Sequence, residues 1–264
     1  EPNMKRWNDF LDRHKNPKTN VEIGLIGKYV ELKDSYKSIT EALIHAGANS
    51  RTKVDIRWIH SESLTRENAS RALKDLHGVI VAPGFGSRGL EGKIAAVKIA
   101  REEGVPFLGI CFGMQASVIE YSRNVLNLYD ANSREVDPDT KNAVIDLMED
   151  QKKVIKKGGT MRLGACNCEL KKGTKSYELY SKKTISERHR HRFEFNNSYL
   201  ESLEKLGMRA AGVNPETGLV EIVEIPSHPW FIGVQFHPEY KSTVVNPHPL
   251  FVSFVNASLI HKNS

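Results

Sequence analysis

Cysteine is scarce in this sequence, and long hydrophobic runs are absent. Three cysteines in 264 residues are too few for a disulfide framework, which favours a reducing compartment and predicts a cytoplasmic protein. No stretch approaches the roughly 18 consecutive apolar residues of a membrane span, so we expect no membrane contact. The segment Glu1–Arg6 is followed by no apolar signal core and lacks an initiating methionine. We therefore expect a piece of a longer protein.

A strong excess of one charge is also missing. The 38 Lys+Arg and 32 Asp+Glu residues leave a net charge of +6, which suits an anionic partner such as a nucleotide but is too dispersed to indicate nucleic acid. The most basic stretch, Glu187–Arg192, has no aromatic platform beside it, and we interpret it as a charged loop that lines an anionic site. Cys166 and Cys168 have no second pair to complete a zinc site, so we expect no metal.

The first half of the chain alternates short apolar segments with helical patterns. The predicted strands are 21–27, 54–59, 78–82 and 105–108, and the predicted helices lie between Ser35, a possible N-cap, and Gly47, and at 66–76 and 94–102. This order predicts an α/β fold with a doubly wound, mostly parallel central sheet. In such folds the functional site lies at the carboxyl ends of the strands.

The second half reads as an antiparallel extension of that sheet. Its predicted strands are 161–169, 176–180, 192–195, 208–212, 219–224 and 230–236, followed by a closing helix at 250–259. Residues 1–20 are interpreted as a linker with one short helix that buries Trp7, Phe10 and Leu11. The globular domain is expected to span residues 21–264.

A cysteine stands between a predicted strand and a predicted helix. Cys111 is flanked at two residues on either side by Gly109 and Gly113, a pattern similar to the Gly-x-Ser-x-Gly nucleophile elbow with sulfur in place of oxygen. The glycines permit a sharp turn, and the helix N-terminus favours a thiolate. Although a free cysteine is most often a small buried hydrophobe, this context favours Cys111 as a nucleophile.

A cysteine nucleophile needs a base, and one of the ten histidines is well placed. His237 directly follows the apolar segment 230–236, at a predicted strand end, and Glu239 lies two residues later. On an extended segment, which Pro238 would stiffen, these two side chains point the same way. A carboxylate at Glu239 can then fix the tautomer and orientation of the imidazole.

Attack on a carbonyl also needs N–H donors for the oxyanion. By the logic of the nucleophile elbow, one is the backbone N–H of Phe112, and Gly84 in the glycine-rich loop 83–89 is the natural second donor. The alternative, a phosphate cradle, is disfavoured because this loop matches neither common glycine-rich phosphate-binding pattern.

Cys111, His237 and Glu239, in this order and on this fold, resemble the triad of class I glutamine amidotransferases. Finer motifs over residues 21–260 resemble the glutaminase domain of the CTP synthase family. These motifs are Gly27–Val30, Phe85–Gly92, Gly109–Gln115, Asp130–Ser133, Gly158–Gly164, Glu187–Arg192 with Asn196–Asn197, and Gln235–Glu239.

The resemblance implies a reaction. Cys111 would attack the side-chain amide of L-glutamine, release ammonia and leave a thioester that water hydrolyses to glutamate. By position, Gly84 and Phe112 match the oxyanion groups, and Gln115, Glu135 and Arg192 match the glutamine-binding residues. A carboxylate for the substrate ammonium and a guanidinium for its carboxylate make chemical sense.

The resemblance also implies partners. Residues 1–20 resemble the linker to an N-terminal synthetase domain, absent here, which in the family uses ATP and magnesium to aminate UTP. GTP is the family's activator, and the full-length enzyme is expected to be a homo-oligomer. We expect no cofactor in this domain itself, and no nucleic-acid partner.

The sequence departs from the family at two places. The oxyanion loop usually reads Pro-Gly-Gly-Phe-Gly but here is Ala82-Pro83-Gly84-Phe85-Gly86, and Pro83 has no N–H to donate. Phe112 stands where leucine is usual. Pro83 keeps open a non-catalytic regulatory or assembly module of the same fold, and a separate alternative is a cysteine hydrolase of this fold that acts on γ-glutamyl substrates or peptides.

Overall fold

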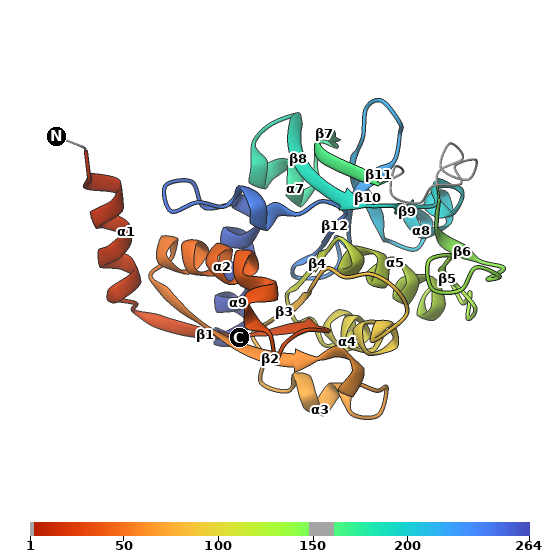
Figure 1. The fold of residues 1–264 in the computed structure, drawn as a ribbon, viewed down its shortest axis with the longest axis horizontal. Coiled ribbons are helices and arrows are strands. Elements are labelled where there is room, and N and C mark those ends of the chain that lie inside the picture. Colours follow the sequence, from red (N-terminus) through yellow and green to blue (C-terminus); the bar gives the residue numbers. More distant parts are fainter. Residues whose placement is uncertain (1–2, 148–160) are drawn as a thin grey trace.

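A nine-stranded mixed sheet runs through the described part of the chain (Figure 1). The computed structural model describes residues 3–147 and 161–264, so residues 158–160 of one motif lie outside the described residues. Five neighbouring strands are parallel, namely β2 (Thr52–His60), β1 (Thr19–Gly27), β3 (Gly78–Val81), β4 (Phe107–Ile110) and β12 (Phe231–Val234). Four antiparallel strands extend it, namely β11 (Val220–Glu224), β10 (Arg209–Val213), β7 (Arg162–Leu170) and β8 (Thr184–His191). The predicted fold class is confirmed.

Helices cover both faces of the parallel half. Helices α2 (Lys37–Asn49) and α9 (Pro249–Asn263) pack on one face, and α4 (Leu90–Glu103) and α5 (Phe112–Asn124) pack on the other. The short helix α3 (Ala69–Leu73) packs beside α4. Alternate residues of a strand point to opposite faces, so Ile80 joins the core under α2 and α9 while Val79 and Val81 join the core under α4 and α5.

A second, three-stranded sheet lies beside α5. It consists of β5 (Asn132–Ser133), β6 (Ala143–Leu147) and β9 (Phe193–Phe195). The strand predicted at 192–195 is therefore present, but it pairs with β6 instead of extending the large sheet.

Helix α1 (Lys5–Lys15) leads into β1 and lies beside α2 in Figure 1. It buries no residue completely, and Trp7 is 43% exposed, so the predicted buried stripe is wrong. Its contacts with the body include an ion pair between Arg51 and Asp12 (2.7 Å) and an edge-on contact of Phe10 with His45.

Several other predictions about elements are wrong for local reasons. Residues 176–180 belong to a helix, α7 (Lys175–Tyr180), because the Thr174 side chain caps it by accepting from Tyr177 N (3.1 Å). The predicted loop Glu187–Arg192 lies mostly in β8, where its two-residue alternation suits a strand. Ser35 is inside a 3₁₀ turn, and α2 begins after it, at Lys37. Helix α8 (Leu200–Lys205) was not expected.

None of the helices in the described part of the chain combines the length and apolar character that a bilayer crossing requires.

Two glycines allow α5 to start directly above the sheet. A Cβ on Gly113 would lie 2.1 Å from the carbonyl oxygen of Val81, and a Cβ on Gly109 would lie 2.8 Å from the backbone of Gly113. Both distances are far inside van der Waals contact with backbone that cannot easily move. The close approach of β3, β4 and α5 therefore requires glycine at both positions.

We expect Gly113→Ala to lower the free energy of unfolding by about 2 kcal/mol or more, because its methyl group overlaps the Val81 carbonyl. Denaturant unfolding measures the change. Gly84→Ala is the matched control, since the nearest atom to its added methyl is the flexible end of Lys93 at 3.4 Å. Equal losses of stability in the two variants would contradict this packing argument.

Candidate active site

Cys111 occupies a strained turn between β4 and α5. Its φ of 53° and ψ of −104° are rare for a residue with a side chain, and its N–H donates to the carbonyl of Val234 on β12 (2.7 Å). The side chain is 2% exposed and lies at the N-terminus of a 13-residue helix. This is the geometry of a nucleophile elbow, with the thiol held where the helix dipole favours a negative charge.

His237 and Glu239 form a buried pair just beyond β12. The imidazole Nδ1 and the carboxylate Oε1 are 2.8 Å apart, and both side chains are at most 5% exposed. The segment is not extended as predicted, because a 3₁₀ turn, Pro238–Lys241, begins immediately after His237. Proline suits the first position of a helical turn, where no N–H is needed. The predicted contact is present, although the predicted backbone is wrong.

The environment of His237 favours its charged form. Burial alone would lower the pKa of the imidazole, but Cys111 and Glu239 outweigh burial and raise the pKa to about 10. Its Nε2 atom is buried and makes no hydrogen bond of ordinary geometry to the described residues, while Cys111 is the neighbour that influences the ring most strongly. The free ring nitrogen is therefore available to exchange a proton with the thiol or with a substrate.

The loop after β3 is held by charged side chains from three other parts of the chain. The Lys93 ammonium on α4 donates to Ala82 O (2.6 Å) and lies 3.5 Å from Pro83 O. Lys28, which follows β1, donates to Phe85 O. Glu135, which follows β5, accepts from Gly86 N (2.6 Å). Gly84 lies in the middle of this loop, next to Lys93.

Phe112 is the first residue of α5. Its N–H precedes the first hydrogen bond of the helix, from Gln115 N to Cys111 O, so no carbonyl of the helix itself can accept from it. Its buried ring receives Lys93 Nζ at 4.9 Å and Lys28 Nζ at 5.9 Å from the ring centroid. The phenylalanine thus packs against the two lysines that hold the neighbouring loop.

Sequence reasoning missed Lys93. The side chain has no exposed surface, and burial, reinforced by the nearby Lys28 charge, lowers its pKa to about 7. The only signal was a lysine directly before the predicted helix 94–102, in a helix that in fact begins at Leu90. Such a residue is normally exposed, so its burial beside Gly84 could be seen only in three dimensions.

Gln115 is linked to Cys111 through a second glutamine. Its amide donates to Phe193 O (3.0 Å) and to Gln235 Oε1 (3.2 Å), and Gln235 Nε2 lies 3.7 Å from the Cys111 sulfur. The Oε1 atom of Gln115 is buried and has no hydrogen-bond partner among the described residues. This unpaired acceptor is suited to a donor on a bound ligand.

Glu135 and Arg192 supply opposite charges to the same region. Burial raises the pKa of Glu135, while its bond from Gly86 and the charges of Lys28 and Arg192 act in the opposite direction. Arg192, between β8 and β9, has a buried Nε without a hydrogen-bond partner among the described residues. The structure therefore gathers the eight residues predicted for the site around the ends of β3, β4 and β12.

A buried polar cluster lies near His237. Arg162 pairs with Glu221 (2.6 Å) and more loosely with Glu194 (3.5 Å), and His189 and His191 bond to each other (2.8 Å). Burial raises the pKa of Glu194 to about 8 and lowers the pKa of His189 to about 3. The inward residues of the basic stretch thus form a largely neutral network. The expectation of a charged loop at this position is wrong.

Strand β8 is joined directly to the segment His237–Lys241. His237 N donates to Arg188 O (2.8 Å), and Lys241 Nζ donates to Ser186 O. Glu187, on the same strand, also accepts from Tyr180 (3.1 Å) and lies 3.2 Å from His248 Nε2. These contacts fix the backbone from which the imidazole projects.

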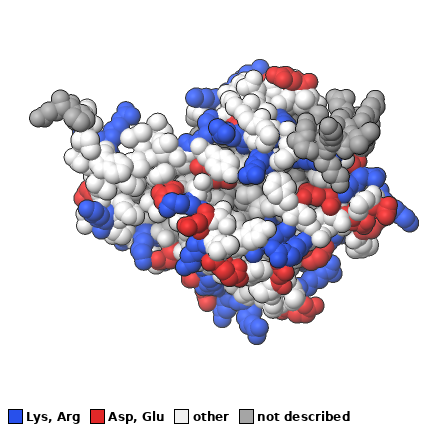
Figure 2. All heavy atoms as spheres, in the orientation of Figure 1, with Lys and Arg blue, Asp and Glu red and all other residues white. Residues whose placement is uncertain are grey.

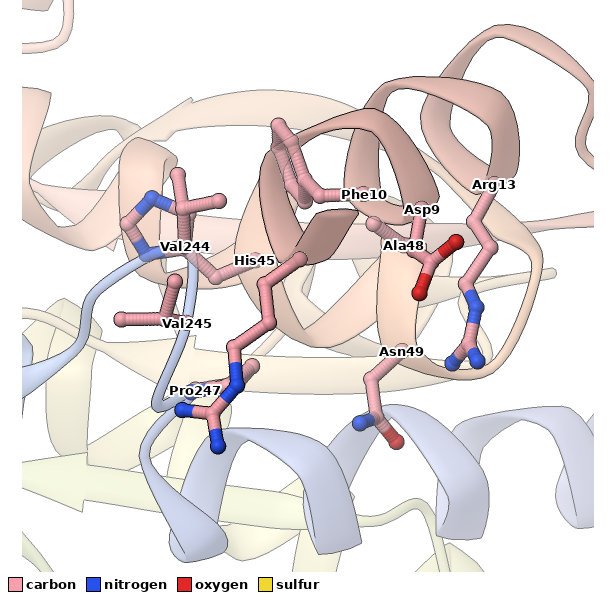
Figure 3. Close-up of a pocket in the computed structure, with 10 residues that line it drawn as sticks. Asp9, Phe10, Arg13, His45, Ala48, Asn49, Val244, Val245 and Pro247 are labelled. Atoms are coloured by element: carbon pink, nitrogen blue, oxygen red, sulfur yellow. The ribbon is translucent and has the colours of Figure 1, made fainter. Parts of the chain in front are cut away.

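The rest of the surface has different character. On the face drawn in Figure 2, basic and acidic side chains are interspersed. A separate hollow of about 220 Å³ lies between α1, α2 and the segment Val244–Pro247, where Figure 3 shows Asp9 and Arg13 near Asn49. It contains none of the predicted site residues. Within residues 3–147 and 161–264, no group of three metal-ligating side chains is assembled.

Comparison with known proteins identifies the family. The family model for class-I glutamine amidotransferases matches residues 31–257. The chain belongs to the class-I glutamine amidotransferase family. Its fold is similar to the Trypanosoma brucei CTPS glutaminase domain with bound acivicin, at 38% identity and a TM-score of 0.86 over 91% of this chain and 94% of that one. A glutamine amidotransferase from Thermotoga maritima shares the fold alone, at 13% identity and a TM-score of 0.51, over 92% of this chain and 94% of that one.

Within the family, the amidotransferase domain is of the CTP synthase type. It is 62% identical to CTP synthase of Flavobacterium psychrophilum over 99% of its own length and 49% of that protein. It is 63% identical to CTP synthase of Christiangramia forsetii over 98% of its length and 48% of that protein. The chain thus spans about half the length of the curated relatives it matches, and the resemblance stated from the motifs is confirmed.

We expect the pKa of His237 to fall in both Cys111→Ala and Glu239→Gln, because each variant removes a neighbour that raises it. Titration of the histidine ring protons by NMR measures the change, with the His237 signal assigned from a His237→Gln variant. His228, whose Nε2 lies 3.0 Å from Ala100 O, is the internal control and should titrate as before. An unchanged His237 titration would contradict the coupling of the three groups.

Proposed function

We propose that Cys111, His237 and Glu239 form the catalytic triad with which this amidotransferase domain hydrolyses L-glutamine. Two observations support it best. The Cys111 thiol lies on a turn with positive φ at a helix N-terminus, and the His237 imidazole is bonded at 2.8 Å to the buried carboxylate of Glu239. Triads of this kind are recognised by geometry and role, since the same arrangement recurs on unrelated folds.

In the first half of the reaction, the Cys111 thiolate attacks the side-chain carbonyl carbon of glutamine. The carbonyl oxygen takes up negative charge, which the N–H groups of Phe112 and Gly84 stabilise, a contribution of about 3 kcal/mol per donor. His237 then gives its proton to the departing nitrogen. Ammonia leaves, and a γ-glutamyl thioester remains on Cys111.

In the second half, water replaces ammonia. His237 takes a proton from the water, which attacks the thioester carbonyl, and the same donors stabilise the second oxyanion. The bond to sulfur then breaks, which releases glutamate and restores the thiolate and imidazolium. Glu239 keeps the imidazole in one orientation throughout.

The two ends of the substrate require opposite charges. Glu135 is assigned to the substrate ammonium and Arg192 to its carboxylate, and the unpaired Oε1 of Gln115 accepts a further donor from the substrate. Because Glu135 also accepts from Gly86 N, substrate binding and the loop after β3 share one carboxylate. A peptide hydrolase has no need for this pair of charges, whereas a γ-glutamyl substrate carries the same amino-acid head group as glutamine.

The longer relatives suggest the fate of the ammonia. We assign residues 1–20 to a linker and residues 21–264 to the amidotransferase domain of a cytoplasmic, homo-oligomeric CTP synthase. There a synthetase domain would use ATP and magnesium to aminate UTP with this ammonia, and GTP would activate the process. The proposal draws on the similarity to CTP synthases of about twice this length.

We expect Cys111→Ala to lower glutamine hydrolysis at least about 10³-fold, because no other group can form the thioester. Glutamate release from L-glutamine measures it. Cys166→Ala, which removes a half-exposed cysteine of β7, is the control and should keep the wild-type rate. Thiol-independent glutamate release, or none from a folded wild-type chain, would contradict the proposed function.

Binding can be tested without turnover. The Trypanosoma brucei domain binds acivicin, so we expect acivicin to protect Cys111 from alkylation by iodoacetamide. Peptide mass spectrometry reports the labelled cysteine. Protection that is lost in Glu135→Gln would support the assigned binding residue, whereas unchanged alkylation in the presence of acivicin would argue for a module that does not bind glutamine analogues.

A further inference from the structure

A buried lysine lies beside the oxyanion loop and has no role in the mechanism above. Lys93 projects from α4, has no exposed surface, and places its ammonium against the loop backbone at Ala82 and Pro83. A purely structural residue here would be apolar, as Ile94 and Val97 of the same helix are, because an isolated buried charge is destabilising. The ammonium therefore calls for a reason beyond filling space.

The geometry of the peptide unit between Pro83 and Gly84 supplies such a reason. The carbonyl of Pro83 and the N–H of Gly84 belong to a single planar, trans peptide, so they point in opposite directions. An ammonium that attracts Pro83 O consequently directs Gly84 N–H away from itself. The stronger bond, to Ala82 O at 2.6 Å, fixes the preceding peptide as well.

Lys93 holds the first part of this loop, through the carbonyls of Ala82 and Pro83. Lys28 and Glu135 hold the following part, through Phe85 O and Gly86 N. Pro83 cannot donate a backbone hydrogen bond of its own, and Gly84 has no side chain to restrict its rotation. The orientation of the peptide between them thus depends on groups outside the loop.

We propose that Lys93 is a positioning residue of the glutaminase reaction: its ammonium holds the carbonyls of Ala82 and Pro83 and thereby aims the N–H of Gly84 at the oxyanion. The role rests on the proposed function, since it assumes attack by Cys111 on a glutamine amide. Lys93 itself touches no reacting atom. Its contact with the Phe112 ring ties the two oxyanion donors into one unit.

The test is Lys93→Met, which keeps an unbranched chain of similar size but removes the ammonium. We expect kcat for glutamine hydrolysis to fall about 10- to 100-fold with little change in KM, because an oxyanion donor acts mainly in the transition state. Lys98→Met, at the other lysine of α4, is the matched control and should keep the wild-type kcat. Thermal unfolding verifies that both variants are folded.

A second readout separates loop positioning from an effect on the nucleophile. Iodoacetamide alkylates sulfur by displacing iodide, so no oxyanion forms and the loop is not used. Lys93 is close enough to Cys111 for the two charges to interact, so we expect alkylation of Cys111 in Lys93→Met to slow far less than hydrolysis does, as followed by peptide mass spectrometry. A parallel loss of alkylation and hydrolysis would show that Lys93 acts on the thiolate and would overturn the proposal.

The remaining outcomes are equally decisive. A kcat for Lys93→Met within about threefold of wild type would refute the role of Lys93 and leave the glutaminase intact. A folded wild-type chain without glutamine hydrolysis would instead overturn the proposed function and, with it, this inference. If Lys93→Met does not fold, Lys93→Gln, whose shorter amide cannot reach both carbonyls, is compared in the same two assays with the same expectations.

Discussion

The backbone of Cys111 is the constraint on which the site depends. A non-glycine residue with positive φ is stable only where its surroundings leave no alternative, and here the sheet supplies that confinement. The N–H is bonded to β12, while Gly109 and Gly113 let α5 sit within contact of β3. The strand order β3-β4-β12 thus places the loop after β3 on one side of Cys111 and His237 on the other.

Around this turn the protein buries ionisable side chains, although their charged forms are more stable in water. Burial lowers the pKa of Lys93 and raises the pKa values of Glu135 and Glu221, whereas Glu221 and Glu194 outweigh burial and raise the pKa of Arg162. Each is compensated by hydrogen bonds to backbone or to an opposite charge, so the groups are fixed before a substrate arrives. Such preorganisation lowers a reaction barrier at the expense of folding free energy.

The sequence predicted the parallel half well because its signals are local. Apolar runs of strand length alternate with helices, and the spacing around Cys111 and between His237 and Glu239 reports a turn and a contact directly. The antiparallel half was harder, since capping by Thr174 turned a β-like segment into a helix and β8 was mistaken for a loop. Lys93 was missed because it acts on the loop after β3, a different element, and no spacing pattern in the sequence indicates that contact.

The two contacts between β8 and the segment His237–Lys241 have a further effect. Strand β8 forms one border of the large sheet, and a border strand offers unpaired carbonyls to any other chain that can add a strand. Ser186 and Arg188, two residues apart, direct theirs to the same side, and Lys241 and His237 occupy both. The exposed Arg188 and Arg190 side chains also repel a positively charged strand of another chain that approaches this edge. The segment that contains His237 therefore also covers this edge and disfavours edge-to-edge aggregation.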